Sequence, residues 1–250
     1  MIASLMMYNR PEIAAENARY WGLIRQAFAA RGIEVPRELS NDADEFDVWL
    51  SPDLVFSQTC GLPYRTTLNG HVALVGTPDF GLEGCPAGHY KSAVLVRADD
   101  PREALSDFQD ARFVFNQSCS QSGYGTAYHL AQEHGFWFTD RKESGGHVLS
   151  AKAVAEGSAD IAFVDAHTYR FIERYDTHGK NLRVLTYTAP TPATPYITAD
   201  AAQADAMFEG VRAAVAALDH ADREVLGLNG VVRISHDAYC AVPNPPDATF

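Results

Sequence analysis

The sequence predicts an α/β fold made of two units, and three observations lead to that prediction. Short apolar runs alternate with helical patterns along almost all of the 250 residues, which is the order typical of α/β proteins. The chain leaves its first series of strands at Asp99-Asp100-Pro101. A Pro-rich segment at residues 189–195 then has the form of an extended crossover. A chain of this length can bury the core of one large domain or of two lobes.

The first unit begins with a buried strand at residues 2–7. Pro11 stands at the first position of a helix that Gly32 ends. The apolar face of that helix is formed by Tyr20, Trp21, Ile24 and Phe28. Further strands are expected at residues 54–58, 72–76 and 92–97. The last of these is apolar enough to lie inside a covered sheet.

A second α/β unit follows. Its helices are expected at residues 104–109, 122–134, 150–156 and 166–175. Its strands are expected at residues 112–116, near Gly146, and at 161–164 and 182–186. Gly157 provides the stop between a helix and the next strand.

The Ala-rich stretch at residues 200–219 predicts one more helix, and the tail from Val231 predicts a short strand and a Pro-rich segment that wraps a surface. This order assigns residues 1–95 plus 195–250 to a discontinuous lobe 1 and residues 96–194 to an inserted lobe 2. A ligand is expected in a cleft between the lobes, where pockets are common.

Composition excludes several classes of function. The formal net charge is -12 and Lys and Arg are scattered, which argues against a nucleic-acid or anionic-membrane surface. The N-terminus lacks the pattern of a secretory signal and no apolar run reaches membrane-helix length. A cytoplasmic location is expected, or a periplasmic one if a leader has been removed. The cysteines Cys60, Cys85, Cys119 and Cys240 lack zinc-site spacing and are expected to be free thiols.

The stretch from Ser118 to Gly123 is the most informative of the chain. It joins an apolar strand to a helical pattern, and it holds Ser118, Ser120 and Ser122. Free N–H groups and the positive end of a helix dipole make such a junction suited to an anion. The alternative is an ordinary Ser N-cap, which needs only one hydroxyl. We therefore predict a site for a small anion.

Four segments in this order resemble the phosphate/phosphite/phosphonate solute-binding proteins of ABC transporters. The segments are residues 90–96, 120–123, 144–147 and 157–165. The resemblance covers most of residues 1–198. It implies the type 2 periplasmic-binding fold, with two α/β lobes joined by two crossover segments. It also implies binding of phosphate, phosphite or a phosphonate, an ABC permease as partner, and no catalysis. A monomer is expected.

The resemblance also implies residue roles. In the family a Ser-Thr-Ser turn holds the phosphonate oxygens with help from a Tyr and a His, which here correspond to Ser120, Ser122, Tyr90 and His147. Gln121 replaces the usual Thr. Family members that bind an aminoalkyl phosphonate use carboxylates to contact the amine of the ligand. At the corresponding positions this chain has His167 and Thr194. An aminoalkyl ligand is therefore not expected.

Other candidates come from the residues alone, each with a structural alternative. His147 would donate to an oxyanion or cap a helix. Asp165 ends an apolar strand, where open α/β sheets gather ligand residues, or caps the next helix. Thr59 and Tyr8 end strands of the first unit, but Thr59 also suits a turn and Tyr8 also suits packing. Neither Cys60 nor Cys119 shows the neighbouring base that a nucleophile needs.

Two other functions stay open. One is a cytosolic enzyme on the same fold, similar to those of menaquinone or thiamin-precursor synthesis, in which His147 and Asp165 would form an acid–base pair. The other is a cytosolic ligand-sensing module. No cofactor or metal is expected.

Overall fold

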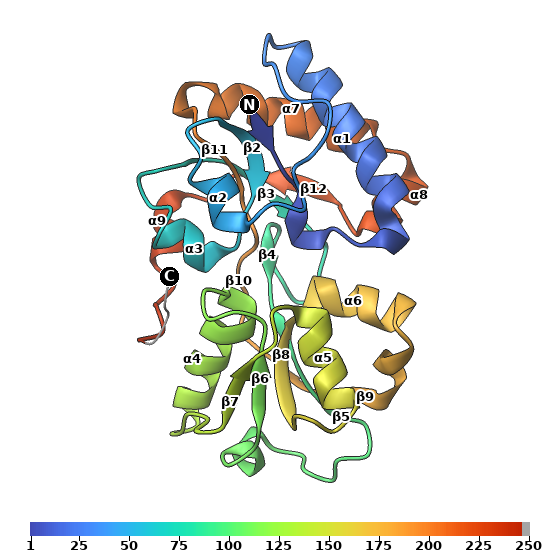
Figure 1. Cartoon of the computed structure of the whole chain (residues 1–250), viewed down its shortest axis with the longest axis vertical. Helices are drawn as coiled ribbons and strands as arrows, with labels where there is room; N and C mark the ends of the chain where they lie inside the picture. The colour runs from blue at the N-terminus through green and yellow to red at the C-terminus, as the bar shows by residue number, and fades with distance from the viewer. Residues whose placement is uncertain (247–250) are drawn as a thin grey trace. The chain divides into compact units, whose positions relative to one another are not determined.

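The computed structural model describes residues 1–246, which form two compact units (Figure 1). Unit 1 contains Met1–His89 and Pro192–Val242; unit 2 contains Tyr90–Thr191 and the described residues from Pro243 on. The chain passes between the units at two strands, β4 (His89–Tyr90) and β10 (Thr191–Pro192), which pair with each other. The boundary expected at residue 95 falls inside a strand of unit 2.

Unit 1 is built on a five-stranded mixed sheet in the order β1-β2-β11-β3-β12. The strands are β1 (Ile2–Ala3), β2 (Leu54–Gln58), β3 (Ala73–Asp79), β11 (Tyr196–Thr198) and β12 (Gly230–Val232). Strands β1 and β2 are parallel, whereas β11 runs antiparallel to both of its neighbours and β12 runs antiparallel to β3. Two of these strands therefore come from the chain after unit 2.

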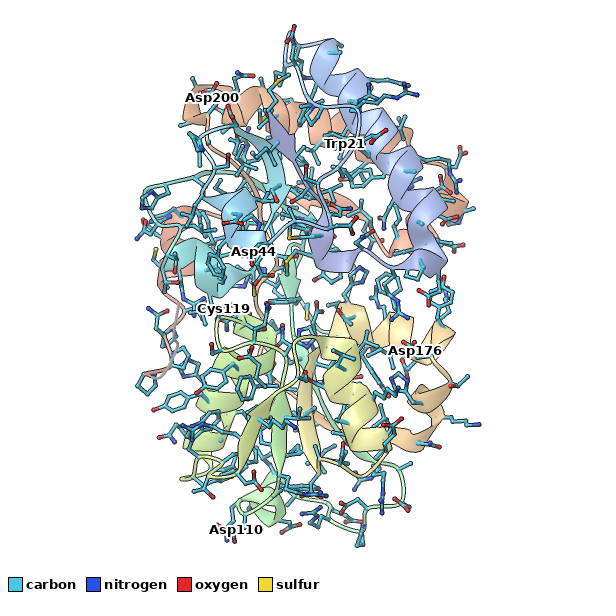
Figure 2. All side chains as sticks on the ribbon, viewed as in Figure 1. Trp21, Asp44, Asp110, Cys119, Asp176 and Asp200 are labelled. Carbon is cyan, nitrogen blue, oxygen red and sulfur yellow. The ribbon has the colours of Figure 1, made fainter. Side chains whose placement is uncertain are left out.

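The helices of unit 1 are α1 (Ala14–Ala29), α2 (Glu45–Trp49), α3 (Gly61–Arg65), α7 (Ala204–Ala217), α8 (His220–Leu226) and α9 (His236–Cys240). The long helix α1 buries the expected apolar face, and its Trp21 ring, labelled in Figure 2, stacks on Phe56 of β2 at 6.3 Å between ring centres. Helix α1 also packs on α7, where a Cβ at Gly210 would lie 2.5 Å from the Phe28 ring. Because Gly210 has no side chain, the two helices pack closely.

Unit 2 is built on a second five-stranded sheet, in the order β7-β6-β8-β5-β9. The strands are β5 (Ser92–Arg97), β6 (Phe113–Phe115), β7 (Arg141–Glu143), β8 (Ile161–Asp165) and β9 (Leu182–Tyr187). Strands β6, β7 and β8 are parallel, and β5 is antiparallel to β8 and β9. The helices are α4 (Thr126–Glu133), α5 (His147–Ala155) and α6 (Ala166–Tyr175).

Both faces of this second sheet are covered. Val94 and Val96 of β5 belong to an aromatic-rich cluster with Phe113 and Phe163, whereas the alternate residue Leu95 packs with a second, aliphatic cluster. Successive side chains of a strand point to opposite faces, so a strand buried on both sides is apolar without interruption. The prediction of a covered strand at residues 92–97 is confirmed.

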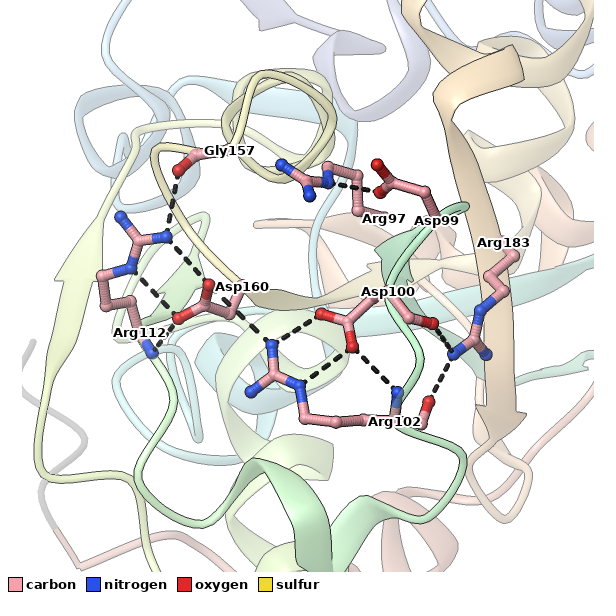
Figure 3. Close-up of polar contacts among 8 residues, drawn as sticks. All are labelled: Arg97, Asp99, Asp100, Arg102, Arg112, Gly157, Asp160 and Arg183. Atoms are coloured by element: carbon pink, nitrogen blue, oxygen red, sulfur yellow. Dashed lines mark hydrogen bonds and ion pairs between the residues drawn. The ribbon is translucent and has the colours of Figure 1, made fainter.

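One edge of unit 2 carries a chain of ion pairs (Figure 3). Asp160 accepts from Arg112 at 2.8 Å and lies 3.9 Å from Arg102, which also pairs with Asp100 at 2.6 Å. Arg183 donates to the carbonyl oxygens of Asp100 and Arg102. These contacts join β9, the entry to β8 and the loop after β5.

Several predicted elements need correction. The first strand ends at Ala3 and Tyr8 lies in a 3₁₀ turn, Met6–Tyr8, because the Leu5 N–H donates to Asn41 Oδ1 at 2.8 Å instead of continuing the sheet. The strand expected near Gly146 lies earlier, at Arg141–Glu143, and Gly146 instead caps α5. The helix expected at residues 104–109 is a 3₁₀ turn, Leu105–Phe108.

The C-terminal segment also differs from the prediction. Residues 195–250 were all expected in lobe 1, but Pro243 accepts a hydrogen bond from His129 of unit 2 at 3.0 Å. The described residues from Pro243 on therefore group with unit 2. Residues 247–250 lie outside the described part of the chain.

Short helical turns connect several of these elements. They include the 3₁₀ turns Pro11–Ile13, Thr177–Asn181 and Ala201–Gln203, and the π-helical turn Gln121–Gly125, called η4 below.

Candidate functional site

The candidate site of unit 2 lies where three parallel strands end. Strands β6, β7 and β8 run in the same direction, so the segments that follow them emerge at one edge of the sheet. The segment after β6 leads to the Ser120 turn, that after β7 leads to His147, and β8 ends at Asp165. Strand β5 is antiparallel to β8 and pairs Ser92 with Asp165, so Ser92 lies at the same edge. Loops at the carboxyl ends of parallel strands are where open α/β sheets place ligand residues.

Ser120 is the cap of the turn. Its hydroxyl accepts a hydrogen bond from the Gly123 N–H at 3.0 Å, and its carbonyl accepts from the Gly125 N–H at 2.9 Å. The next five residues form the π-helical turn η4, which continues directly into α4. The first N–H groups of a helix have no partner within the helix, and π-turns are frequent at functional sites. In this turn Ser120 accepts from the N–H groups of Gly123, Tyr124 and Gly125, so the hydroxyl groups of the serines are the donors that we consider for an anion.

Ser122 is fixed from behind by its own backbone. Its carbonyl accepts from the Ser92 hydroxyl at 2.8 Å and from the Thr126 hydroxyl at 2.7 Å. The Thr126 hydroxyl also contacts the Ser92 hydroxyl at 3.2 Å. These residues are buried, so the turn is tied to the first residue of β5. Ser92 and Thr126 are not among the residues predicted from the sequence, because an isolated hydroxyl in an apolar strand or helix forms no recognisable pattern.

Asn116 is a further polar residue at the turn that the sequence pattern does not indicate. It follows β6 directly and is 8% exposed, and its Oδ1 atom has no hydrogen-bond partner among the described residues. A Cβ at Gly123 would lie only 1.8 Å from that oxygen. The amide therefore packs directly on the turn, in space that a side chain at position 123 would fill. A buried polar atom without a partner is costly, but an amide oxygen only accepts hydrogen bonds, so an oxyanion at the turn would need its own O–H to pair with it.

His147 contacts the turn through its ring. Its Nε2 atom lies 2.8 Å from the Ser122 hydroxyl, and it is the first residue of α5. Burial lowers the pKa of His147 to about 4, against a smaller opposing effect of the Phe163 backbone. The imidazole is therefore neutral near pH 7. In the tautomer with the proton on Nε2 it donates to Ser122, which leaves the Ser122 O–H free to donate to an anion.

The remaining predicted residues of unit 2 have other contacts. Asp165 is 3% exposed and caps α6, because its carboxylate accepts from the His167 N–H at 2.7 Å. His167 is 1% exposed, and burial lowers its pKa to about 3. The Ser118 N–H donates to the Glu143 carboxylate at 3.2 Å, which places a negative charge beside it. Gln121 is buried inside η4, and Tyr90 is buried on β4.

Unit 1 holds a separate polar group around the start of its crossover. The Thr194 hydroxyl lies 3.0 Å from the Gln58 amide nitrogen and 3.4 Å from the Tyr8 hydroxyl. Thr59 is fully buried, and its hydroxyl has no hydrogen-bond partner among the described residues. The Tyr8 ring also packs edge-on against Phe80 at 5.1 Å. Tyr8 therefore contacts a polar side chain of this group, and the four side chains of Tyr8, Gln58, Thr59 and Thr194 are uncharged.

The structure also bears on metals, membranes and thiols. In the described part of the chain, no group of three or more His, Cys, Asp or Glu side chains gathers where a metal ion would be held. No helix within residues 1–246 has the length and apolar character needed to span a bilayer. Within residues 1–246 none of the four cysteines forms a disulfide; Cys60 and Cys119 are buried and Cys240 is exposed. Cys119, labelled in Figure 2, marks the loop that leads to Ser120.

A comparison with protein-family models gives one match. The model described as "ABC transporter, phosphonate, periplasmic substrate-binding protein" matches residues 56–239. This range covers more than half of the chain and includes both the Ser120 turn and His147. No curated protein matches the chain.

Solved structures with the same fold come from distant relatives. PhnD1 of Prochlorococcus marinus, solved with methylphosphonate, gives a TM-score of 0.73 at 12% identity and covers 96% of this chain and 94% of its own. A binding-protein component of a Pseudomonas aeruginosa phosphonate transporter gives 0.70 at 14%, with coverages of 95% and 82%. A Candida albicans protein with the generic periplasmic-binding fold gives 0.61 at 12%, with coverages of 95% and 78%. The predicted fold class is confirmed.

Proposed function

We propose that this chain, which belongs to the periplasmic phosphonate substrate-binding proteins of ABC transporters, binds a small tetrahedral oxyanion at the turn Ser120–Gly123. The family consists of substrate-binding proteins rather than enzymes, which favours the binding function over the enzyme alternative. The observation that carries the site is the Ser120 turn, which brings the buried hydroxyl groups of Ser120 and Ser122 together with His147.

Three features support an anion at this place. The turn supplies the serine hydroxyl groups at the start of a helix. The helix dipole adds partial positive charge there. Hydrogen bonds from Ser92 and Thr126 fix the turn before a ligand binds. Binding therefore loses little conformational entropy. A net charge of -12 on the chain does not oppose this, because local donors decide the affinity.

The contact between Ser122 and His147 serves binding rather than catalysis. A serine next to a histidine is also the geometry of an activated nucleophile. A base with a pKa near 4 takes up a proton poorly at neutral pH. Asp165, the proposed acid–base partner of the enzyme alternative, is used as the cap of α6. A neutral imidazole instead acts as a hydrogen-bond partner that orients the Ser122 hydroxyl.

The substituent on the anion is expected to be uncharged. At the two positions where the resemblance places carboxylates for an amine, His167 is buried with a lowered pKa and Thr194 pairs with Gln58. Neither carries a negative charge at neutral pH. We therefore expect phosphate, phosphite or methylphosphonate to bind better than 2-aminoethylphosphonate, in titration calorimetry of the full chain. Tighter binding of the amine would reject the uncharged site.

The serine pair gives the direct test of the site. Ser120→Ala with Ser122→Ala should weaken the best-binding oxyanion by about a hundred-fold or more, since hydrogen bonds to charged groups contribute roughly 1.5–3 kcal/mol each. Ser158→Ala, which changes an exposed serine of unit 2, is the matched control. Unchanged affinity in the double variant, with the same melting temperature as the parent, would place the anion elsewhere.

The biological setting follows from the family. An ABC permease is the proposed partner, and the working form is proposed to be a monomer. The family is periplasmic, which gives the cytoplasmic expectation no support and favours its stated alternative. Cell fractionation with antibody detection should find the native protein in the periplasm. A purely cytosolic protein would favour the sensing function.

A further inference from the structure

Three side chains of unit 1 form a hydrogen-bonded row outside the anion site. The Cys240 sulfur lies 3.2 Å from His236 Nε2, and His236 Nδ1 lies 3.0 Å from the Tyr64 hydroxyl. Cys240 and His236 lie one turn apart on α9, and Tyr64 comes from α3. A nucleophile, a base within hydrogen-bond reach and a third group that orients the base are the parts of an activated nucleophile.

The third group is held rigidly. Tyr64 is 3% exposed, and its ring packs edge-on against Tyr239 at 5.0 Å and against the His236 ring at 5.7 Å. Burial, with a smaller contribution from Cys240, raises the pKa of Tyr64 to about 12. The phenol therefore keeps its proton and its oxygen can accept from Nδ1–H. That tautomer leaves Nε2 as the acceptor that faces the thiol.

Access separates Cys240 from the other thiols. Cys60 and Cys119 are buried, Cys85 is partly buried, and Cys240 is exposed together with His236. Thiol reactivity depends on access and on a neighbouring group that takes the proton. Cys240 combines both in the structure.

We propose that Cys240 is a covalent modification site that undergoes exchange with low-molecular-weight disulfides, with His236 as the base and Tyr64 as a positioning residue. The thiol gives its proton to His236 Nε2, and the thiolate attacks one sulfur of the disulfide RSSR. A new Sγ–S bond forms as the S–S bond breaks, and the leaving thiolate takes the proton from the imidazolium. The products are the mixed disulfide on Cys240 and one RSH.

The test uses 5,5′-dithiobis(2-nitrobenzoic acid) on the native full chain, with release of the coloured thiol followed over time. One thiol per chain should react in a fast phase that Cys240→Ser removes. His236→Ala should slow that phase about tenfold or more, and Tyr64→Phe, which keeps the ring, should slow it less. Oxidised glutathione should give a single adduct that peptide mapping assigns to Cys240.

Matched controls separate activation from simple exposure. Cys85→Ser should keep the fast phase, and His220→Ala, an exposed histidine on α8, should leave its rate unchanged. Melting temperatures check that each variant is folded. A fast phase that survives Cys240→Ser, or a rate unaffected by both His236→Ala and Tyr64→Phe, would overturn the proposal. These outcomes are independent of anion binding, which depends on unit 2.

Discussion

Gly123→Ala should disrupt the anion site through one added methyl group. The new Cβ would lie 1.8 Å from Asn116 Oδ1 and 3.2 Å from His147 Cε1. Since real Cβ contacts stay at or above 3.0 Å, the amide must move by about 3.0 − 1.8 = 1.2 Å. The Asn116 backbone is held by the Gly145 N–H at 2.8 Å, so the side chain has to move. That movement removes the amide from the turn.

The expected magnitude follows from this overlap. Forcing an extra methyl into packed surroundings costs about 1–3 kcal/mol, which for a chain of this size lowers the melting temperature by roughly 2–12 °C. Affinity for the oxyanion should fall by about tenfold or more, since the strained turn should lose at least one hydrogen bond from its serine hydroxyls to the charged ligand. In Asn116→Ala/Gly123→Ala the obstructing amide is absent. The stability cost of the glycine change should then be much smaller.

Thermal unfolding and titration calorimetry measure both effects. Gly22→Ala is the matched control, because a Cβ there meets nothing within 4 Å in the middle of α1. It should stabilise the protein by about 0.5–1 kcal/mol and leave the anion affinity unchanged. A Gly123→Ala protein with the melting temperature and affinity of the parent would refute the packing argument.

Two further predictions concern pH. Because the pKa of His147 is lowered to about 4 by burial, the unfolded chain binds a proton that the folded chain does not. The free energy of unfolding should fall as pH drops from about 6.5 towards 4, by roughly 2 kcal/mol at pH 5. In urea unfolding, His147→Gln should lack this part of the pH dependence. An equal fall in both proteins would show that His147 is not its source. Hydrogen bonding from Arg102 lowers the pKa of Asp100 to about 2. The contribution of the Asp100 carboxylate to the free energy of unfolding is therefore present above about pH 4 and lost as pH falls towards 2. Asp100→Asn should be less stable than the parent at pH 7 and equally stable near pH 2, and a constant difference would exclude the ion pair as the cause.

Elements with a strong apolar pattern could be predicted from the sequence. The strand at residues 92–97 and the helix at residues 166–175 have the predicted bounds. Each has a continuous or periodic apolar pattern that burial requires. Strand β7, Arg141–Lys142–Glu143, is exposed at every residue and lies at the edge of its sheet, so it shows no such pattern. The five-residue helices α2, α3 and α9 are too short for a period to show.

In the candidate site too, some residues can be proposed from a sequence pattern and others cannot. Ser120 and Ser122 could be proposed as ligand residues because hydroxyls cluster at a strand-to-helix junction. Asn116 could not be found, because its importance depends on the contact with Gly123 across the turn. The sequence also does not show that the carboxylate that accepts from the Ser118 N–H comes from residue 143. Contacts between distant parts of the chain decide which polar residues of a motif face a ligand.

The place of β11 in the first sheet has a consequence for the order in which the protein folds during synthesis. β11 lies between β2 and β3, and it consists of residues 196–198. Until the ribosome has made these residues, the two earlier strands lack the neighbour that joins them. All strands of the second sheet, from residue 92 to residue 187, have been made by then. The inserted unit can therefore fold first, while the strands of the N-terminal part of the chain stay exposed to solvent until β11 has been synthesised.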